Sequence, residues 1–242
     1  MIELVNIKKS FEGRIVLDDI SAKFHKGKTN FVIGASGSGK SVMMKCMVGL
    51  INVDEGQILY GGTDFVKLDY NEKKTIRKEI GMLFQGTALF DSLNVEDNVA
   101  FPLRMFTTMT KEEVLERVNF CLKRVNLENV NKLYPSNISG GMKKRVGIAR
   151  AMALNPKYLF CDEPNSGLDP LTSRLIDELI KEITVEYDIT TIINTHDMKS
   201  LFVMGDNIIY IYKGKKVWEG EKSQIRTADN PKLLEFMKAS EF

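Results

Sequence analysis

The chain has 242 residues, enough for one large domain or two small subdomains that share a core. Hydrophobic residues make up 43% of it, which is typical of a globular protein and too high for a disordered one. The 34 basic and 32 acidic residues leave a net charge of +2, so we expect no broad electrostatic surface for nucleic acid. The three cysteines form no CxxC pair, which argues against a disulfide framework and against a zinc site.

The sequence also lacks the patterns of a membrane or secreted protein. No apolar stretch approaches the roughly 20 residues needed to span a bilayer. The start of the chain does not combine a charged region with an apolar one, as a signal peptide would. We therefore expect a cytoplasmic protein whose role at a membrane, if it has one, depends on a partner.

Strand-like and helix-like segments alternate along the chain, which favours an α/β fold with a mixed or parallel sheet. Several of the strand-like segments are apolar almost throughout, as expected for strands that are covered on both faces. The predicted strands are 2–7, 29–33, 158–161, 190–194 and 208–212.

The first segment that carries chemistry follows the predicted strand 29–33. Residues 34–41 fit the pattern GxxxxGK[ST], and residues 41–49 can form the helix that this pattern requires. The glycines let the backbone curl so that its N–H groups point at phosphates, and the start of the helix adds its positive end. In this pattern the lysine reaches the β- and γ-phosphates and the hydroxyl binds Mg²⁺. The predicted cradle consists of Gly34, Ser36, Gly37, Ser38, Gly39, Lys40, Ser41 and Val42.

The middle of the chain is expected to be a helical insertion between two halves of the α/β core. Its clearest predicted helix, 111–126, carries apolar residues at helical spacing with charges between them. Thr110 is the expected N-cap, and Glu113 completes a capping box. We therefore divide the chain into a helical subdomain, 89–155, and a catalytic core made of 1–88 and 156–242.

Two acids, Asp162 and Glu163, follow the apolar segment 158–161. Because ligands of α/β sheets bind at the carboxyl ends of strands, we expect both acids near the nucleotide. Asp162 can hold Mg²⁺ directly or through water. Glu163 is the candidate general base that polarises the attacking water, an effect of roughly 10²–10⁴ in rate.

A second phosphate-binding segment is expected at Ser139, Gly140 and Gly141. Ser139 is a good N-cap, and the two glycines leave backbone N–H groups open to an anion. The helix that follows begins with Lys143, Lys144 and Arg145, which we expect to make its start electropositive.

These motifs resemble those of the ABC transporter ATPase family, in their order and over nearly the whole chain. ISGGM at 138–142 stands where the family signature LSGGQ occurs, and SGGMKKRVGIARAMALNPKYLFCDEPNSGLD at 139–169 is specific to the family. The resemblance implies a P-loop NTPase (RecA-like) α/β core with a mixed sheet, an antiparallel β edge and an inserted α-helical subdomain. The chain departs from the family at Met142, where glutamine is usual, and at Val42, where Thr or Ser is common.

The resemblance also implies that the chain works as a homodimer. In the family, the signature segment faces the γ-phosphate of the ATP held by the other subunit, so a monomer has an incomplete site. Two ATP molecules with Mg²⁺ would then hold the dimer closed, and hydrolysis would remove the contacts that bridge it.

Four further residues receive roles from the resemblance. Phe11, after the first strand, matches the aromatic residue that stacks on adenine, with an ordinary core Phe as the alternative. Gln85 matches the glutamine that senses Mg²⁺ and the γ-phosphate and relays them to a membrane partner. Asp169 belongs to the loop that crosses the dimer interface. His196 matches the switch histidine, which holds the attacking water and Glu163 in place.

The segment 83–103 is similar to that of the ATPases of Mla (MCE-type) lipid transporters, which move phospholipids between the inner and outer membranes. This similarity implies an MlaE-type membrane permease and, indirectly, a periplasmic MCE lipid-binding protein as partners. The chain would then lie on the cytoplasmic face of the inner membrane. The segment also places apolar residues near Gln85, and these either form a groove for a partner's helix or pack inside the helical subdomain. They are Leu89, Phe90, Leu93, Phe101, Pro102 and Leu103.

Three alternatives to lipid transport remain. The first is an ABC transporter ATPase for another substrate, such as an amino acid or a lipoprotein. The second is an ABC ATPase that acts on nucleic acid, against which stand the near-zero net charge and the lack of a long coiled-coil insertion. The third is an ATP-gated scaffold without hydrolysis, against which stand Glu163 and His196.

Overall fold

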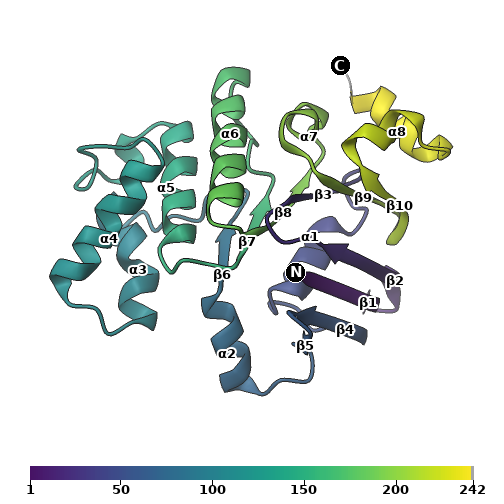
Figure 1. Cartoon of the computed structure of the whole chain (residues 1–242), viewed down its shortest axis with the longest axis horizontal. Coiled ribbons are helices and arrows are strands. Elements are labelled where there is room, and N and C mark those ends of the chain that lie inside the picture. Colours follow the sequence, from purple (N-terminus) through teal and green to yellow (C-terminus); the bar gives the residue numbers. More distant parts are fainter. Residues whose placement is uncertain (241–242) are drawn as a thin grey trace.

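The computed structural model describes residues 1–240 as two β-sheets with helices around them (Figure 1). The central sheet consists of β3 (Thr29–Ile33), β6 (Ile80–Leu83), β7 (Tyr158–Asp162), β8 (Thr190–Thr195), β9 (Asn207–Tyr212) and β10 (Lys215–Glu221). Its strand order is β10-β9-β3-β8-β7-β6. All neighbours are parallel except β10, which pairs antiparallel with β9 at one edge. The predicted mixed sheet with an antiparallel edge is therefore confirmed.

The second sheet is antiparallel and has the order β2-β1-β4-β5. Its strands are β1 (Ile2–Phe11), β2 (Arg14–Phe24), β4 (Glu55–Tyr60) and β5 (Thr63–Asp64). β1 continues to Phe11, whereas the sequence predicted an end at Ile7. The register of β1 shifts between Leu4 and Ile7, where Asn6 has a φ of 49°. The pairing with β2 nevertheless continues beyond this irregularity, through Lys9 and Ser10 to Phe11.

The first helix, α1 (Lys40–Met47), packs into a hydrophobic cluster that both sheets share. It contributes Met43, Met44 and Met47, each at most 1% exposed. Across the same cluster, Tyr60 of the antiparallel sheet meets Tyr158 of the central sheet edge to face, with ring centroids 4.8 Å apart. This packing holds the start of α1 at the carboxyl end of β3, where the predicted cradle lies.

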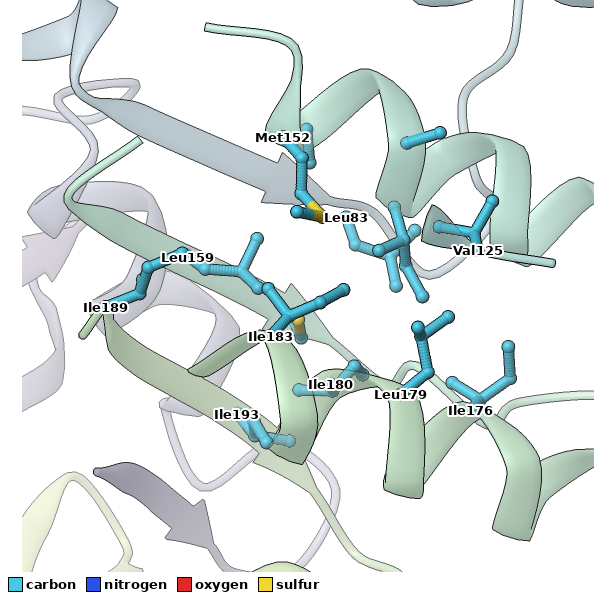
Figure 2. Packing of buried hydrophobic residues seen from close by; sticks show 14 of the residues in the cluster. Leu83, Val125, Met152, Leu159, Ile176, Leu179, Ile180, Ile183, Ile189 and Ile193 are labelled. Carbon is cyan, nitrogen blue, oxygen red and sulfur yellow. The ribbon is translucent and has the colours of Figure 1, made fainter. Parts of the chain in front are cut away.

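The other helices are α2 (Tyr70–Lys78), α3 (Val95–Phe106), α4 (Lys111–Arg124), α5 (Gly140–Met152), α6 (Pro170–Glu186), α7 (Met198–Met204) and α8 (Pro231–Ser240), with 3₁₀ turns at Pro135–Asn137 and Lys222–Thr227. A second hydrophobic cluster covers the opposite face of the central sheet and continues without a break into α3, α4 and α5. Figure 2 shows part of it, where Leu159 of β7 and Ile180 of α6 lie near Met152 of α5 and Val125 after α4.

Helices α3, α4 and α5 lie together on one side of the molecule (Figure 1) and fall inside the predicted insertion. The predicted capping box of α4 is confirmed. The amide of Thr110 donates to Glu113 Oε2 at 2.7 Å, and the amide of Glu113 donates to Thr110 Oγ1 at 3.2 Å. The division of the chain at residues 89 and 155 stays a prediction.

Two further findings concern the whole described chain. Cys46, Cys121 and Cys161 are buried free thiols, and burial raises the pKa of Cys46 to about 11 and that of Cys161 to about 12. Within residues 1–240, no helix is both long enough and apolar enough to cross a bilayer.

Candidate nucleotide-binding site

A cavity of about 1170 Å³ opens at the carboxyl ends of the central strands. The loops after β3, β6, β7 and β8 all contribute to it, as expected for ligand sites of α/β sheets. Its lining includes these predicted residues: Phe11, Ser36, Gly37, Gly39, Lys40, Ser41, Val42, Gln85, Glu163 and His196. Among these predicted residues, the fold brings together positions as far apart in the sequence as Phe11 and His196.

The loop between β3 and α1 depends on the backbone freedom of glycine. Gly34 has a φ of 153°, and a Cβ atom there would lie 2.3 Å from the carbonyl oxygen of Ile211. Gly39, at the N-cap of α1, has a φ of 109° and contributes no side-chain cap. The first amide groups of α1 therefore need another acceptor, and phosphate oxygens suit them in charge and in position.

The side chain of Lys40 is buried beneath this loop and bonds its backbone. Its Nζ donates to the carbonyl oxygens of Gly34 at 2.7 Å and Ala35 at 3.1 Å, and the residue is only 7% exposed. Burial lowers the pKa of Lys40, and the charges of Glu163 and Asp162 oppose that shift. Beside it, the buried hydroxyl of Ser38 has no hydrogen-bond partner among residues 1–240. A buried cation and an orphaned hydroxyl fit a polyphosphate.

Hard oxygen donors face each other next to this loop. Ser41 Oγ lies 3.4 Å from Asp162 Oδ1, and the side-chain Nδ2 of Asn194 donates to the same carboxylate oxygen at 3.3 Å. A hydroxyl and a carboxylate oxygen, together with phosphate oxygens and water, form the ligand set that Mg²⁺ prefers. Ser41 and Asp162 therefore fit the predicted metal site.

Glu163 has an unusual backbone conformation at the end of β7. Its φ is 48°, which is rare for a residue other than glycine, and its amide donates to Asn194 O at 2.9 Å. This turn aims the carboxylate at the next loop. Oε1 lies 2.9 Å from His196 Nδ1, and Thr195 Oγ1 donates to Oε2 at 3.4 Å. The Glu163 side chain is only 15% exposed, and these two contacts fix its orientation at the edge of the cavity.

The side chain of Phe11 lies at the cavity and not in the hydrophobic core, so the alternative of an ordinary core residue is wrong, and the stacking role stays a prediction. It is 43% exposed, lines the cavity and lies outside both hydrophobic clusters. Lys9 places its Nζ 5.2 Å from the ring centroid.

The signature segment is not among the residues that line the cavity. Ser139 caps α5 as expected, accepting from the amide of Met142 at 3.2 Å. A Cβ atom on Gly141 would lie 2.6 Å from the Thr172 side chain, so the signature packs against the start of α6. There Asp169 acts as N-cap and accepts hydrogen bonds from the amides of Leu171 and Thr172, both at 3.0 Å.

Two of the three basic residues expected at the helix start are engaged within their own chain. Lys144 is 4% exposed, and its Nζ donates to Gln85 O at 2.6 Å. Arg145 donates to Asn126 O at 2.9 Å. Both side chains donate to backbone carbonyls of their own chain, because the face of α5 that carries them packs against the rest of the molecule.

The apolar residues near Gln85 divide between the two alternatives. Leu103 is 1% exposed and packs inside the helical cluster. Phe90 and Phe101 are 42% and 37% exposed, and their ring centroids lie 4.7 Å apart. The aromatic pair therefore lies at the surface beside the loop that carries Gln85.

The cavity also has walls that the sequence did not predict: Glu12, Arg14, Ile15, Val16, Lys213, Gly214, Phe236 and Ser240. The turn between β9 and β10 reaches the cradle directly, since the amide of Gly214 donates to Ser38 O at 3.0 Å. Lys213 and Gly214 form this turn with φ values of 47° and 79°, as a two-residue hairpin requires, but nothing in the local sequence shows where the hairpin docks.

Comparison with known proteins agrees with this geometry. The sequence model of the family described as ABC transporter matches residues 17–166. The chain belongs to the ABC transporter family. It is an ABC transporter ATPase subunit, and its cofactors are ATP and Mg²⁺. Such cassettes dimerise and pair with membrane permeases.

Several ATP-binding proteins of transporters are similar to it. A probable ribonucleotide transport ATP-binding protein, mkl of Mycobacterium leprae, is 37% identical over 98% of this chain and 68% of that protein. The methionine import ATP-binding protein MetN of Campylobacter jejuni is 37% identical over 100% of this chain and 77% of its own length. The intermembrane phospholipid transport ATP-binding protein MlaF of Haemophilus influenzae is 34% identical over 98% of this chain and 90% of its own length.

Solved cassettes share the fold. A dimeric ATP-binding cassette in a post-hydrolysis state, bound to ADP and Pi, superposes with a TM-score of 0.83 at 32% identity, over 91% of this chain and 98% of that one. A cassette of the cbiONQ transporter complex of Clostridium perfringens gives a TM-score of 0.84 at 27% identity, over 98% of each chain.

Proposed function

We propose that this ABC cassette powers phospholipid movement between the inner and outer membranes through a partner permease, with Glu163 as the general base of ATP hydrolysis. The carboxylate held between His196 and Thr195 supports the chemical part of this proposal. The similarity of segment 83–103 to lipid-transporter ATPases supports the substrate.

In the hydrolytic step, Glu163 accepts a proton from the water that attacks the γ-phosphorus, and the bond to the β–γ bridging oxygen breaks to release ADP and phosphate. Lys40 and the amides of the cradle stabilise the charge that develops on the phosphate oxygens. His196 holds the Glu163 carboxylate in place through Nδ1. Ser41, Asp162 and Gln85 would hold Mg²⁺, which neutralises phosphate charge.

A second copy of the chain is part of the proposal. Ser139, Gly140 and Gly141 do not line the cavity of their own chain, which supports their presentation to the nucleotide of a partner subunit, with Asp169 near the same interface. The similar cassette bound to ADP and Pi was itself solved as a dimer.

We place the permease contact at the exposed pair Phe90 and Phe101. These aromatic rings lie in the segment that follows Gln85, so a helix of an MlaE-type permease docked there would feel any movement of that loop. The permease in turn would connect the cassette to a periplasmic MCE lipid-binding protein. On this proposal the chain is peripheral on the cytoplasmic face of the inner membrane and has no nucleic-acid partner.

The identity of the substrate is tested by what the chain assembles with. Affinity purification from detergent-solubilised membranes, followed by mass spectrometry, should recover a permease, an MCE protein and bound phospholipid. Since MetN is equally similar in sequence, recovery of a permease with an amino-acid-binding protein instead would transfer the proposal to amino-acid import. Recovery with ribosomes or DNA would contradict both.

A double substitution tests the permease contact, and an exposed phenylalanine elsewhere provides the matched control. Phe90→Ala with Phe101→Ala should abolish co-purification while leaving ATP binding intact, because neither ring lines the nucleotide cavity. The exposed Phe120→Ala on α4 should leave the complex intact.

A further inference from the structure

Lys144 lies where three parts of the proposed site meet. It comes from the second turn of α5 and is 4% exposed. Its Nζ donates to the backbone carbonyl of Gln85 at 2.6 Å and to that of Glu163 at 3.3 Å. Burial lowers its pKa, whereas nearby Cys161, Glu163 and Asp162 raise it. Burying the Lys144 ammonium away from water has a large desolvation cost. Its hydrogen bonds to the Gln85 and Glu163 carbonyls offset that cost and fix the two loops relative to each other.

The two carbonyls belong to loops that leave the sheet side by side. Strands β6 and β7 are parallel neighbours, with Leu83 opposite Cys161. Gln85 and Glu163 therefore follow adjacent strand ends, and the Lys144 ammonium bridges them from a helix of a different layer. Hydrogen bonds from an ionised donor are shorter and stronger than neutral ones, so the bridge resists separation of the loops.

The same helix holds the rest of the Gln85 loop. Arg150 donates to Thr87 O through Nη2 and to Ala88 O through Nη1, both at 2.7 Å. Thr87 and Ala88 have φ values of 63° and 48°, and such left-handed conformations persist only where the surroundings hold them. Between the two cations, a Cβ atom on Gly147 would lie 2.7 Å from Leu83, so the helix backbone approaches the end of β6 closely.

We infer that Lys144 is a positioning residue for ATP hydrolysis. It fixes the Gln85 loop to α5 and holds the backbone of Glu163 beside that loop. A shift of α5 then moves the backbone carbonyl of Glu163 and, with it, the Glu163 carboxylate. This inference rests on the proposed roles of Gln85 and Glu163. It adds a residue that touches neither nucleotide nor metal.

The test compares Lys144→Met, which keeps the unbranched shape up to Cε and loses the donor, with Lys144→Arg, which keeps the charge and the donors. The exposed Lys123→Met on α4 is the control. We expect Lys144→Met to lower kcat by about 10-fold or more with the Kd for ATP within about 3-fold of the native value, as for loss of an interaction that acts on the transition state. Lys144→Arg should recover most of the rate, and Lys123→Met should change nothing.

A double-mutant cycle with Gln85→Ala separates a positioning role from a structural one. If Lys144 acts through the Gln85 loop, the double variant should lose little more rate than the worse single variant. Should Lys144→Met fold poorly, the milder Lys144→Gln enters the same cycle. The inference is overturned if the folded Lys144 variants keep the native kcat, if their losses multiply fully with that of Gln85→Ala, or if ATP affinity and thermal stability fall in step with kcat. If Gln85→Ala and Glu163→Gln themselves keep the native rate, the proposed catalytic site fails whatever Lys144 does.

Discussion

Replacing Glu163 by glutamine isolates the proposed base from its structural contacts. The amide has the same shape as the carboxylate, so it can keep the contact with His196 at 2.9 Å and accept from Thr195 at 3.4 Å. The backbone φ of 48° is unaffected. We therefore expect the free energy of unfolding to change by less than about 1 kcal/mol, since both hydrogen bonds survive.

What the substitution removes is the ability to accept a proton. Loss of a positioned general base lowers the rate by about 10²–10⁴, which corresponds to roughly 3–5 kcal/mol of activation free energy. ATP affinity should be retained, because Lys40 and the cradle amides are untouched. The variant should consequently accumulate an ATP-bound dimer.

Three measurements check this prediction. Phosphate release gives the rate, titration with a fluorescent ATP analogue gives the Kd, and size-exclusion chromatography with ATP and Mg²⁺ gives the oligomeric state. Glu116→Gln, an exposed carboxylate of α4, is the control for the loss of one negative charge. Hydrolysis by Glu163→Gln at the native rate would refute the assignment of the base, and so would an equal loss in Glu116→Gln.

Three further predictions follow from the geometry. Lys40→Ala should weaken ATP binding by about 10–100-fold, since a charged hydrogen bond contributes about 1.5–3 kcal/mol, and an unchanged Kd would contradict the cradle. Burial raises the pKa of Asp177 from 3.8 to about 6, above that of the unfolded chain, so stability should fall as pH rises from about 4 to about 6 and then stay level. Asp177→Asn should remove that fall and gain about 1–3 kcal/mol at neutral pH, visible as matching thermal unfolding midpoints at about pH 5 and about pH 7.5. Gly34→Ala should destabilise the chain and abolish nucleotide binding, because its Cβ would lie 2.3 Å from Ile211 O. The control Gly37→Ala places its Cβ within 4 Å of nothing, so it should lose only about 1–2 kcal/mol of stability to its φ of 76°. Equal losses of stability in both variants would contradict the close contact at Gly34.

The cradle and the carboxylates could be predicted because their signals are local. A glycine pattern between a strand and a helix carries its own geometry, and an acid after an apolar strand lies at the edge where ligands bind. The start of α2 also carries a local sequence signal. Asp69 and Glu72 form a capping box, with the Asp69 amide donating to Glu72 Oε2 at 2.9 Å and the Glu72 amide donating to Asp69 Oδ1 at 2.8 Å.

The remaining parts of the site depend on tertiary packing and had no local signal. Phe236 reaches the cavity because its ring stacks on Tyr210, with centroids 5.4 Å apart and residues far separated in the chain. Lys144 belongs to a run of basic residues that predicts a solvated or anion-facing helix start. Only the position of α5 against β6 and β7 shows that this lysine faces inward.

The hydrophobic layer of α3, α4 and α5 has no boundary with that of the central sheet, since Val118, Val146 and Ile180 belong to one cluster with Leu159. A helical segment excised at its loops would expose that whole layer to water, and the sheet with α6 would lose the side chains that pack against it from α3, α4 and α5. The helices and the sheet should therefore melt in a single cooperative transition rather than in two steps. Movement of α3, α4 and α5 during the ATPase cycle must then keep their apolar surface buried against the sheet. This requirement limits the amplitude of the movement far below that of a domain joined by a flexible hinge.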